Sequence, residues 1–439
     1  MNVIVIVADS LRKDHLGCYG NEWIRTPNLD RLAAESCVID GAYADSLNTV
    51  PCRTSMWTGR VCFPFRPWQP LERDDLPIAE WLWDKGYTSA LITDVYHMHE
   101  PGYNMGRGFD ETIFIRGQEY DPWLQPSDVD PAEIDAALEH HFKPTDDAER
   151  SADFAARFRH YLRNISGRES EEDYFCAQVC LRGIDWLERH HGEDRLFLWL
   201  DMFDPHEPWD PPPALKEPYN PGYEGLDIID PVPSEVEGYL TPEEMHNVRA
   251  LYAGEVTLVD RWVGRLLTAA RKMGVLDSSL VVFTSDHGEP LDDHGIVRKA
   301  RPWLYEELAA VPLLVRLPDG AGAGQRREAL VRLSDLAPTI CDAAGVDRQP
   351  GTHGTSLLPL VRGETEWVRD HSITGIHNRS AAIRDGRWSL LLPGASGRRE
   401  LYDRREDPTE QHDLAEQLPH EADRLENQLQ RELGELRWE

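Results

Sequence analysis

Short apolar runs rich in β-branched residues recur along the chain and alternate with stretches of helical character. The apolar runs cover residues 2–7, 89–93, 196–200, 280–284 and 311–316. The helical patterns cover residues 26–34, 78–85, 173–189 and 241–273. A run that is apolar at every position suits a strand buried on both faces, and strands that alternate with helices favour a parallel sheet covered on both sides. The sequence therefore predicts an α/β fold with a doubly wound, mostly parallel central sheet.

The 439 residues are enough for such a domain and for a further, smaller unit. We expect the α/β domain to span residues 1–350, with an acidic, helix-rich insertion at 117–170 and a proline-dense insertion at 207–236. Beyond residue 350, short strand-like pieces precede a terminal helix with leucines along one face, which predicts a smaller α+β subdomain over 351–439. The two insertions are expected to shape the ligand pocket.

The charge of the chain limits its partners. Asp and Glu number 78 against 46 Lys and Arg, and the formal net charge is −32. Such a surface repels nucleic acids and anionic membranes, so neither is expected as a partner. A small anionic ligand has to be captured by local cations against this field. A homo-oligomer is compatible with the sequence, which does not determine the assembly.

The sequence also bears on the compartment. It contains no run of ~20 apolar residues of the kind that spans a membrane. Residues 1–14 have neither a basic leader nor a cleavage site of small residues, and the seven cysteines are scattered and odd in number. Together these features predict a cytoplasmic protein.

Acidic side chains follow several of the predicted strands. Each of four aspartates comes at or just after a predicted strand end: Asp9, Asp94, Asp204 and Asp286. Ligands of open α/β sheets bind beyond the carboxyl ends of the strands, so these carboxylates are candidates for one crevice, where a cation would offset their repulsion. An aspartate at a strand end also commonly caps the next helix, and this explanation competes for Asp9 and Asp94 taken singly. His287 directly follows Asp286 and adds a nitrogen ligand that Zn²⁺ and Mn²⁺ accept, so this pair is predicted to bind a metal.

Three further segments carry candidate functional residues. Thr49 precedes Pro51 by two residues, which predicts a helix that starts near Pro51 with the hydroxyl beside free backbone N–H groups, and Arg53 lies one turn further on. His206 follows a predicted strand and is a candidate to protonate a leaving group or to bind an oxyanion. Lys299 is one of six lysines and follows the predicted metal ligands closely, so it is a candidate cation for an anionic substrate.

Taken together, these segments resemble the sulfatase branch of the alkaline-phosphatase superfamily. The family's motifs follow in order along most of the chain, at residues 7–9, 14–20, 26–30, 49–60, 107–111, 204–206, 284–289, 293–295, 305–307, 400–403 and 407–408. The resemblance implies an alkaline-phosphatase-like fold. It also implies metal-dependent hydrolysis of a sulfate, phosphate or phosphonate ester.

Three positions depart from the family's pattern. Sulfatases place a cysteine, later oxidised to formylglycine, in the frame Cys-x-Pro-x-Arg, but residues 49–53 read Thr-Val-Pro-Cys-Arg, so the nucleophile position is a threonine and Cys52 is out of frame. The paired Asp-Asp after the first strand is Asp-Ser at 9–10, and Val95 replaces the lysine of the Lys-Trp-His segment, which keeps His97. Phosphodiesterase, phosphomutase and phosphoethanolamine-transferase relatives use a threonine nucleophile. A reduced ligand set at the first strand resembles the phosphonate monoester hydrolases, although those keep the cysteine. The departures favour a phosphoester substrate.

The resemblance implies one divalent metal bound by Asp9, Asp286 and His287, with Thr49 Oγ as a further ligand. Coordination would lower the pKa of the hydroxyl, so that Thr49 attacks phosphorus and forms a phospho-threonine that water then hydrolyses. Mn²⁺ and Zn²⁺ suit the mixed Asp and His ligands, Ca²⁺ is an alternative, and a second metal ion stays open.

In the same mechanism, Arg53 and Lys299 hold the nonbridging oxygens of the small anionic ester. His206 is expected to protonate the leaving group, and His97 is a second candidate for that role. Three alternatives are left open. They are a sulfatase or sulfamidase that has dispensed with formylglycine, a phosphotransferase or mutase, and a catalytically inactive binding homologue.

Overall fold

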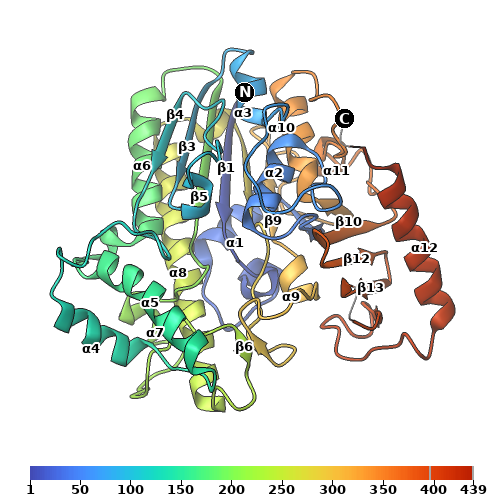
Figure 1. Ribbon diagram of the computed structural model, residues 1–439. Helices are drawn as coiled ribbons and strands as arrows, with labels where there is room; N and C mark the ends of the chain where they lie inside the picture. Colours follow the sequence, from blue (N-terminus) through green and yellow to red (C-terminus); the bar gives the residue numbers. More distant parts are fainter. Residues whose placement is uncertain (395–396, 438–439) are drawn as a thin grey trace.

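The computed structural model describes residues 1–394 and 397–437, and within them the largest element is an eight-stranded sheet (Figure 1). Its order is β10-β2-β9-β7-β1-β5-β3-β4. The strands are β1 (Asn2–Ala8), β2 (Cys37–Tyr43), β3 (Thr88–Thr93), β4 (Glu111–Phe114), β5 (Leu196–Met202), β7 (Ser279–Thr284), β9 (Leu313–Arg316) and β10 (Gln325–Arg332). Neighbours run parallel except where β9 is one of the pair, because β9 is antiparallel to both β2 and β7. The predicted α/β fold with a mostly parallel sheet is confirmed.

Helices cover both faces of this sheet (Figure 1). They are α1 (Pro27–Ala34), α6 (Phe175–His190) and α8 (Pro242–Lys272) on one face, and α2 (Thr49–Thr58), α3 (Ile78–Trp83), α10 (Leu336–Ala344) and α11 (Leu358–Val361) on the other. In β1, Ile4 and Ile6 pack toward the first group, whereas Val3 and Val5 pack toward the second. Burial on both faces is the reason that β1 is apolar at every position. Among the described residues, no helix is long and apolar enough to cross a membrane.

The two predicted insertions lie together at the end of the molecule where β1 finishes (Figure 1). They contain α4 (Pro131–His141), α5 (Ala148–Ile165), α7 (Pro213–Lys216) and β6 (Ser234–Glu235), which pairs with β8 (Ile296–Val297). Side chains join one insertion to the other: the Tyr161 hydroxyl donates to Asp210 at 2.5 Å, and the Tyr120 hydroxyl donates to Asp230 at 3.1 Å. The insertions therefore form one packed layer beside the carboxyl end of β1.

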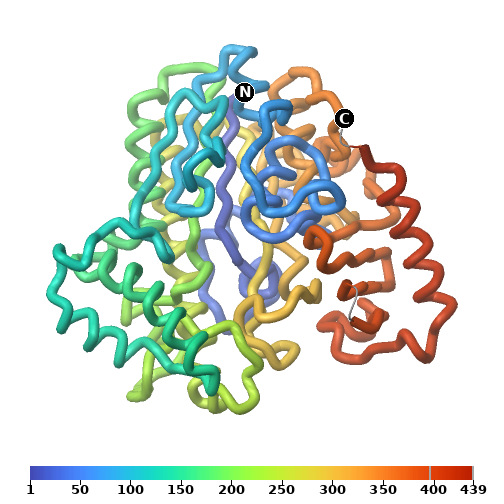
Figure 2. Tube along the Cα trace, viewed as in Figure 1, coloured from blue at the N-terminus to red at the C-terminus, as the bar shows by residue number. Residues whose placement is uncertain are grey.

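A second, antiparallel sheet occupies the C-terminal part of the chain, drawn in orange to red in Figure 2. It consists of β11 (Ser372–Ile376), β12 (Ser380–Arg384), β13 (Trp388–Leu392) and β14 (Glu400–Asp403), and α12 (Pro419–Glu435) packs on it through Leu425 and Leu429. The sheet reaches the segment before α2, where Leu47 N–H donates to the carbonyl oxygen of Gly375 at 2.9 Å. The division at residue 350 stays a prediction, and residues 395–396 and 438–439 of the predicted subdomain lie outside the described residues.

Candidate metal centre and active site

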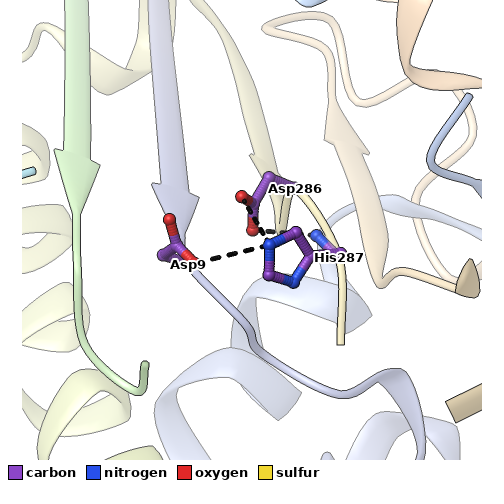
Figure 3. Close-up of side chains that lie close together, drawn as sticks. All are labelled: Asp9, Asp286 and His287. Atoms are coloured by element: carbon purple, nitrogen blue, oxygen red, sulfur yellow. Dashed lines mark hydrogen bonds and ion pairs between the residues drawn. The ribbon is translucent and has the colours of Figure 1, made fainter. Parts of the chain in front are cut away.

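Asp9, Asp286 and His287 meet beyond the carboxyl ends of two neighbouring strands (Figure 3). Asp9 follows β1, whereas Asp286 and His287 follow β7, which pairs in parallel with β1. One potential ligand atom of each side chain lies within 4.8 Å of the others, and all three side chains are fully buried. Within residues 1–394 and 397–437, no other group of His, Cys, Asp or Glu has this spacing. The structure thus brings together three of the residues predicted to bind a metal.

The hydrogen bonds of His287 leave one ring nitrogen facing the two carboxylates. Nδ1 donates to the carbonyl oxygen of Gly288 at 2.9 Å, so Nε2 carries the lone pair. Burial lowers the pKa of His287 to about 4, against the opposing effect of Asp286, and the ring is neutral at pH 7. Nε2 lies 3.3 Å from Asp286 Oδ2 and 3.9 Å from Asp9 Oδ1, and it has no hydrogen-bond partner among the described residues. A lone pair that faces two carboxylates in a buried site is repulsive unless a cation lies between them.

A divalent cation fits this set of donors. Asp9 Oδ2 is a second buried atom that lacks a hydrogen-bond partner within the described part of the chain. Burial and the neighbouring Asp286 raise the pKa of Asp9 well above its usual value, and a bound cation would favour its ionised form. Two carboxylates and one neutral imidazole nitrogen are ligands that Mn²⁺ and Zn²⁺ accept. Enzymes of the sulfatase family bind a divalent metal, which agrees with this donor set.

Replacing His287 by alanine should abolish most of the stabilisation that a metal confers. A ligand at ~100 times its Kd stabilises a folded protein by about 2.7 kcal/mol, so adding Mn²⁺ or Zn²⁺ to chelator-stripped wild-type protein should raise Tm. The rise should be much smaller in His287→Ala, and mass spectrometry of bound metals should find less metal retained. His294→Ala is the matched control, since His294 Nδ1 lies 2.7 Å from Glu307 rather than in this cluster. Equal metal-induced shifts in the wild type and His287→Ala would contradict the assignment.

Arg53 is fully buried and contacts three carboxylates. Its Nη2 donates to Asp201 Oδ1 at 2.6 Å, its Nη1 contacts Asp286, and the same nitrogen lies 3.1 Å from Asp9 Oδ2. Burial alone would raise the pKa of Asp286, but Arg53 and His287 together lower it to about 2. The guanidinium is thus committed to protein carboxylates, and it orients and neutralises the metal ligands. Contact between Arg53 and the nonbridging oxygens of a substrate stays a prediction.

Thr49 is the first residue of α2, two residues earlier than the predicted start near Pro51, and Asn48 is the N-cap residue. The Thr49 side chain is 3% exposed, and the Thr49 hydroxyl has no hydrogen-bond partner among the described residues. The free N–H groups of the first turn and the positive end of the helix dipole favour a bound anion at this position. The Cys52 thiol instead donates to the main-chain oxygen of Asp286 at 3.3 Å, and burial raises its pKa well above the usual value. Cys52 is therefore a buried, protonated thiol beneath the metal ligands.

Lys299 is linked to Asp9 through the residue that replaces the second aspartate of the family's pair. Its Nζ contacts Glu289 and lies 3.4 Å from Ser10 Oγ, and the Ser10 hydroxyl donates to Asp9 Oδ1 at 3.1 Å. Burial opposes the charge of Lys299, but Glu207 and Glu289 raise its pKa above the usual value, so the ammonium stays protonated. The side chain is 17% exposed, which leaves it within reach of a ligand.

His206 is a proton acceptor in this structure. Its Nδ1 donates to the carbonyl oxygen of Glu207 at 2.8 Å, so Nε2 carries the lone pair. Burial lowers the pKa of His206 to about 3, and this outweighs the opposite effect of Glu207. The side chain is neutral at pH 7 and has no proton on Nε2 to donate. The predicted role of His206 as proton donor stays untested, and its tautomer favours proton acceptance.

His97 lies in the 3₁₀ helix Tyr96–His99 that follows β3. Its Nε2 is 2.7 Å from Glu119 Oε2, and its Nδ1 is 3.6 Å from Glu100 Oε1. The side chain is 21% exposed. This second candidate from the sequence therefore has a buried carboxylate close to one ring nitrogen and a partly exposed one farther from the other.

Two of the four strand-end aspartates do not join the cluster. Asp94 Oδ1 accepts a hydrogen bond from the backbone N–H of Phe203 at 2.8 Å. Asp204 accepts from Gln118 Nε2 at 2.8 Å and from the backbone N–H of Cys176 at 3.1 Å. Asp94 and Asp204 are therefore outside the metal-ligand group of the described residues and bind neighbouring loops and the start of α6, and a crevice shared by all four carboxylates stays a prediction.

The sequence analysis also missed three carboxylates of the site. Asp201, the partner of Arg53, lies in β5 between apolar residues, and a charged residue in an otherwise apolar buried strand is a signal that could have identified it. Glu289 follows the predicted metal ligand His287 by two residues, so the same motif could have predicted that Glu289 lies at the site, where it contacts Lys299. Glu119 lies in an irregular loop after β4, and no pattern in the sequence points to it.

Comparisons with known proteins agree along almost the whole chain. A family model described as Sulfatase matches residues 1–346, and one described as N-sulphoglucosamine sulphohydrolase, C-terminal, matches residues 293–439. An arylsulfatase of Clostridium perfringens is 26% identical, over 98% of this chain and 94% of its own. An N-acetylglucosamine-6-O-sulfatase of Bacteroides thetaiotaomicron is 25% identical, over 94% of this chain and 82% of its own. The crystal structure of a phosphonate monoester hydrolase of Agrobacterium radiobacter has the same fold, with a TM-score of 0.76 at 22% identity, over 98% of this chain and 94% of that one.

Proposed function

The chain belongs to the sulfatase family of ester hydrolases, and from that premise we propose that it hydrolyses phosphate or phosphonate esters with Thr49 as its nucleophile. One observation carries the proposal: Thr49 is the first residue of α2, the helix whose Arg53 contacts Asp9 and Asp286, whereas the thiol of Cys52 in the same helix is buried and donates to the main-chain oxygen of Asp286. A formylglycine route needs a cysteine at the position that Thr49 occupies. Without that cysteine, the hydroxyl of Thr49 is the group at this position that can attack the ester.

The proposed reaction has two displacements at phosphorus. In the first, Thr49 Oγ bonds to phosphorus, the bond to the leaving oxygen breaks, and the hydroxyl proton passes to the neutral Nε2 of His206. In the second, water attacks the phospho-threonine, and Oγ recovers its proton as the bond to phosphorus breaks. The second displacement has to occur at phosphorus because a threonine ester lacks the second hydroxyl by which a formylglycine hemiacetal expels its product.

The surroundings of Thr49 support an anionic reaction centre. Lys299 keeps its charge and is partly accessible, so it is placed to neutralise a nonbridging oxygen of the small anionic substrate. When bound at Asp9, Asp286 and His287, a divalent cation would further stabilise negative charge on the reacting oxygens. Arg53 holds two of these ligands, Asp9 and Asp286, in place through ion pairs.

A sulfate ester is the second candidate substrate. The printed names of the Clostridium and Bacteroides relatives are those of sulfatases, and their identity to this chain extends over nearly its full length. Against it stands the missing in-frame cysteine. A sulfate ester carries one charge fewer than a phosphate monoester dianion and the same single charge as a phosphate diester or a phosphonate monoester, so a direct comparison on the same leaving group separates the candidates.

Four aryl esters with the same leaving group test the proposal: a phosphate monoester, a phosphate diester, a phosphonate monoester and a sulfate ester. Each is assayed after metal removal and after reloading with Mn²⁺, Zn²⁺ or Ca²⁺. We expect metal-dependent turnover of a phosphorus ester to exceed turnover of the sulfate ester. Dominant sulfate hydrolysis would replace the first candidate by the second.

A further inference from the structure

Glu119 and His97 form a pair that no part of the proposed mechanism uses. Glu119 Oε2 lies 2.7 Å from His97 Nε2, and the Glu119 side chain is 7% exposed. Its backbone is in the left-handed region, with φ 51, which is uncommon for a residue that is not glycine. A buried carboxylate in such a conformation, aimed at a histidine ring, is the kind of local strain that accumulates at functional sites.

The other ring nitrogen of His97, Nδ1, has a longer contact with a second carboxylate, that of Glu100. Glu119 Oε2 forms an ion pair with Nε2 at 2.7 Å, whereas Glu100 Oε1 is 3.6 Å from Nδ1, which is longer than a hydrogen bond. The ring packs edge-on against Trp68, whose indole is 37% exposed. The ring also contacts Phe203, whose own ring lies 4.1 Å from that of His206 at an interplanar angle of 32°. Nδ1 therefore belongs to a ring that lies between the solvent-accessible Trp68 and the buried His206.

Glu119 and His97 each favour the charged form of the other. Burial alone would lower the pKa of His97, but Glu119 and then Glu100 raise it above its usual value. Burial alone would raise the pKa of Glu119, but His97, and to a smaller extent His206, lower it below its usual value. Both directions agree with an imidazolium–carboxylate ion pair at neutral pH.

We propose that Glu119 is the positioning residue that holds His97 as an imidazolium, so that His97 Nδ1 donates the proton to the leaving-group oxygen. The inference rests on the proposed function, since it assigns the proton donor of that reaction. It gives His97 and His206 opposite roles, because His206 is neutral and its remaining proton is held by the carbonyl of Glu207.

The proton transfer balances as follows. As Thr49 Oγ bonds to phosphorus, the bond from phosphorus to the leaving oxygen breaks and its electron pair stays on that oxygen. The Nδ1 proton of His97 moves to the same oxygen, which leaves an alcohol and a neutral imidazole whose Nε2–H still faces Glu119 Oε2. In the second displacement the attacking water gives a proton to Nδ1, which restores the imidazolium. A carboxylate that orients a histidine in this way supports proton transfer without itself taking the proton.

Several other charged or titratable groups lie beside the pair. Tyr96, in the same 3₁₀ helix as His97, has its ring centroid 5.8 Å from that of His97, and the charge of Glu119 raises the pKa of Tyr120 and of Asp230. Glu100 follows the 3₁₀ helix that carries His97, and Tyr103 beyond it interacts with Glu100 and Trp68. His206 and Glu207, after β5, act on Glu119. Glu100 is the one of these whose carboxylate faces His97 without a hydrogen bond, and it is half-open to solvent at 33% exposure. Glu119 is therefore the group whose removal should most change the charge of His97.

The first arm of the test needs no substrate. Ring ¹³C labels on histidine allow an NMR titration of the zinc-loaded enzyme, with the His97 signal assigned by its loss in His97→Asn. In Glu119→Gln, the midpoint of His97 should fall by more than about one pH unit, since one unit corresponds to 1.36 kcal/mol of lost interaction. Glu119→Asp should recover part of the shift. Glu111→Gln, at the start of β4 with an exposed Arg189 partner, is the matched control and should leave the midpoint unchanged.

The second arm compares leaving groups on whichever ester the enzyme turns over. General acid catalysis contributes about 10²–10⁴-fold, so Glu119→Gln should lower kcat by about 10²-fold for an alkyl leaving group, with little change for 4-nitrophenol, which leaves without a proton. The alkaline limb of the pH profile for the alkyl ester should move to lower pH. KM should change little, because Glu119 touches His97 and not the ester.

Each arm can overturn the proposal separately. An unchanged His97 midpoint in Glu119→Gln overturns it whatever the substrate proves to be. A shifted midpoint with equal losses for both leaving groups shows a structural role and overturns the assignment of His97 as donor. If no ester in the panel is hydrolysed, the proposed function itself fails and the proton-donor role fails with it, although the NMR arm still reports on the ion pair.

Discussion

Replacing Thr49 by alanine should lower kcat/KM by about 10⁴–10⁶-fold, the range found when an enzyme's nucleophile is deleted. The substitution removes the attacking oxygen but leaves the buried Asp and His cluster behind it intact. Thr49→Ser should keep much of the activity, because it retains the hydroxyl at the first residue of α2. Thr58→Ala is the matched control, since the Thr58 hydroxyl donates to the Thr54 carbonyl oxygen at the opposite end of the same helix.

A chemical readout separates loss of the nucleophile from loss of structure. Acid quenching of the wild-type enzyme during turnover of a phosphorus ester should trap a phosphoryl group on the peptide that contains Thr49. The trapped peptide should be missing in Thr49→Ala, while Tm and metal content should match those of the wild type. The activity of Thr49→Ala could instead stay within about tenfold of wild type. A loss that small is less than a single catalytic group contributes, and it would show that the nucleophile lies elsewhere. Cys52→Ala would then be the next variant to assay.

The fold was largely predictable because its strands are buried on both faces. Uniformly apolar runs such as β1 can be recognised without knowing their neighbours, since both of their faces pack against helices. The same reasoning predicted that Asp9 and Asp286 lie close together, because both follow parallel strands that end on one edge. The antiparallel direction of β9 could not be predicted, because an apolar run has the same pattern whether the strand pairs in parallel or antiparallel.

The chemistry of the site was predictable in its residue types but not in its protonation. His97 and His206 are both candidates in the sequence, yet their charge depends on the fold: on Glu119, in a distant loop, for His97 and chiefly on burial for His206. The sequence motif identified Arg53, but the partner of Arg53, Asp201, lies far away in the sequence, in β5. Contacts of this kind form only when the chain is folded, so no spacing in the sequence reports them.

Replacing Arg53 by methionine should destabilise the protein by about 3–5 kcal/mol at pH 7–8, the usual cost of removing one member of a buried ion pair. The change leaves Asp9, Asp201 and Asp286 in a fully buried site without their shared cation. Urea unfolding of the chelator-stripped variant measures the loss. Arg384→Met is the matched control, because Arg384 is equally buried but faces Glu306 and Glu410, away from the metal ligands.

The dependence on pH and metal identifies the origin of that loss. In the wild type the pKa of Asp286 is about 2, below its ordinary value of 3.8, so its contribution to stability is present above pH 3.8 and is lost as the pH falls through about 2. Without Arg53, burial dominates and the pKa of Asp286 should rise above 3.8, so the folded variant should lose stability as the pH rises through that higher value. The deficit of Arg53→Met should therefore narrow from pH 8 to pH 5. Added Mn²⁺ or Zn²⁺ should narrow it too, since a cation neutralises the same carboxylates. The loss of unfolding free energy in Arg384→Met should not change with either metal. If the loss in Arg53→Met is equally insensitive to pH and metal, Arg53 acts through packing rather than through charge.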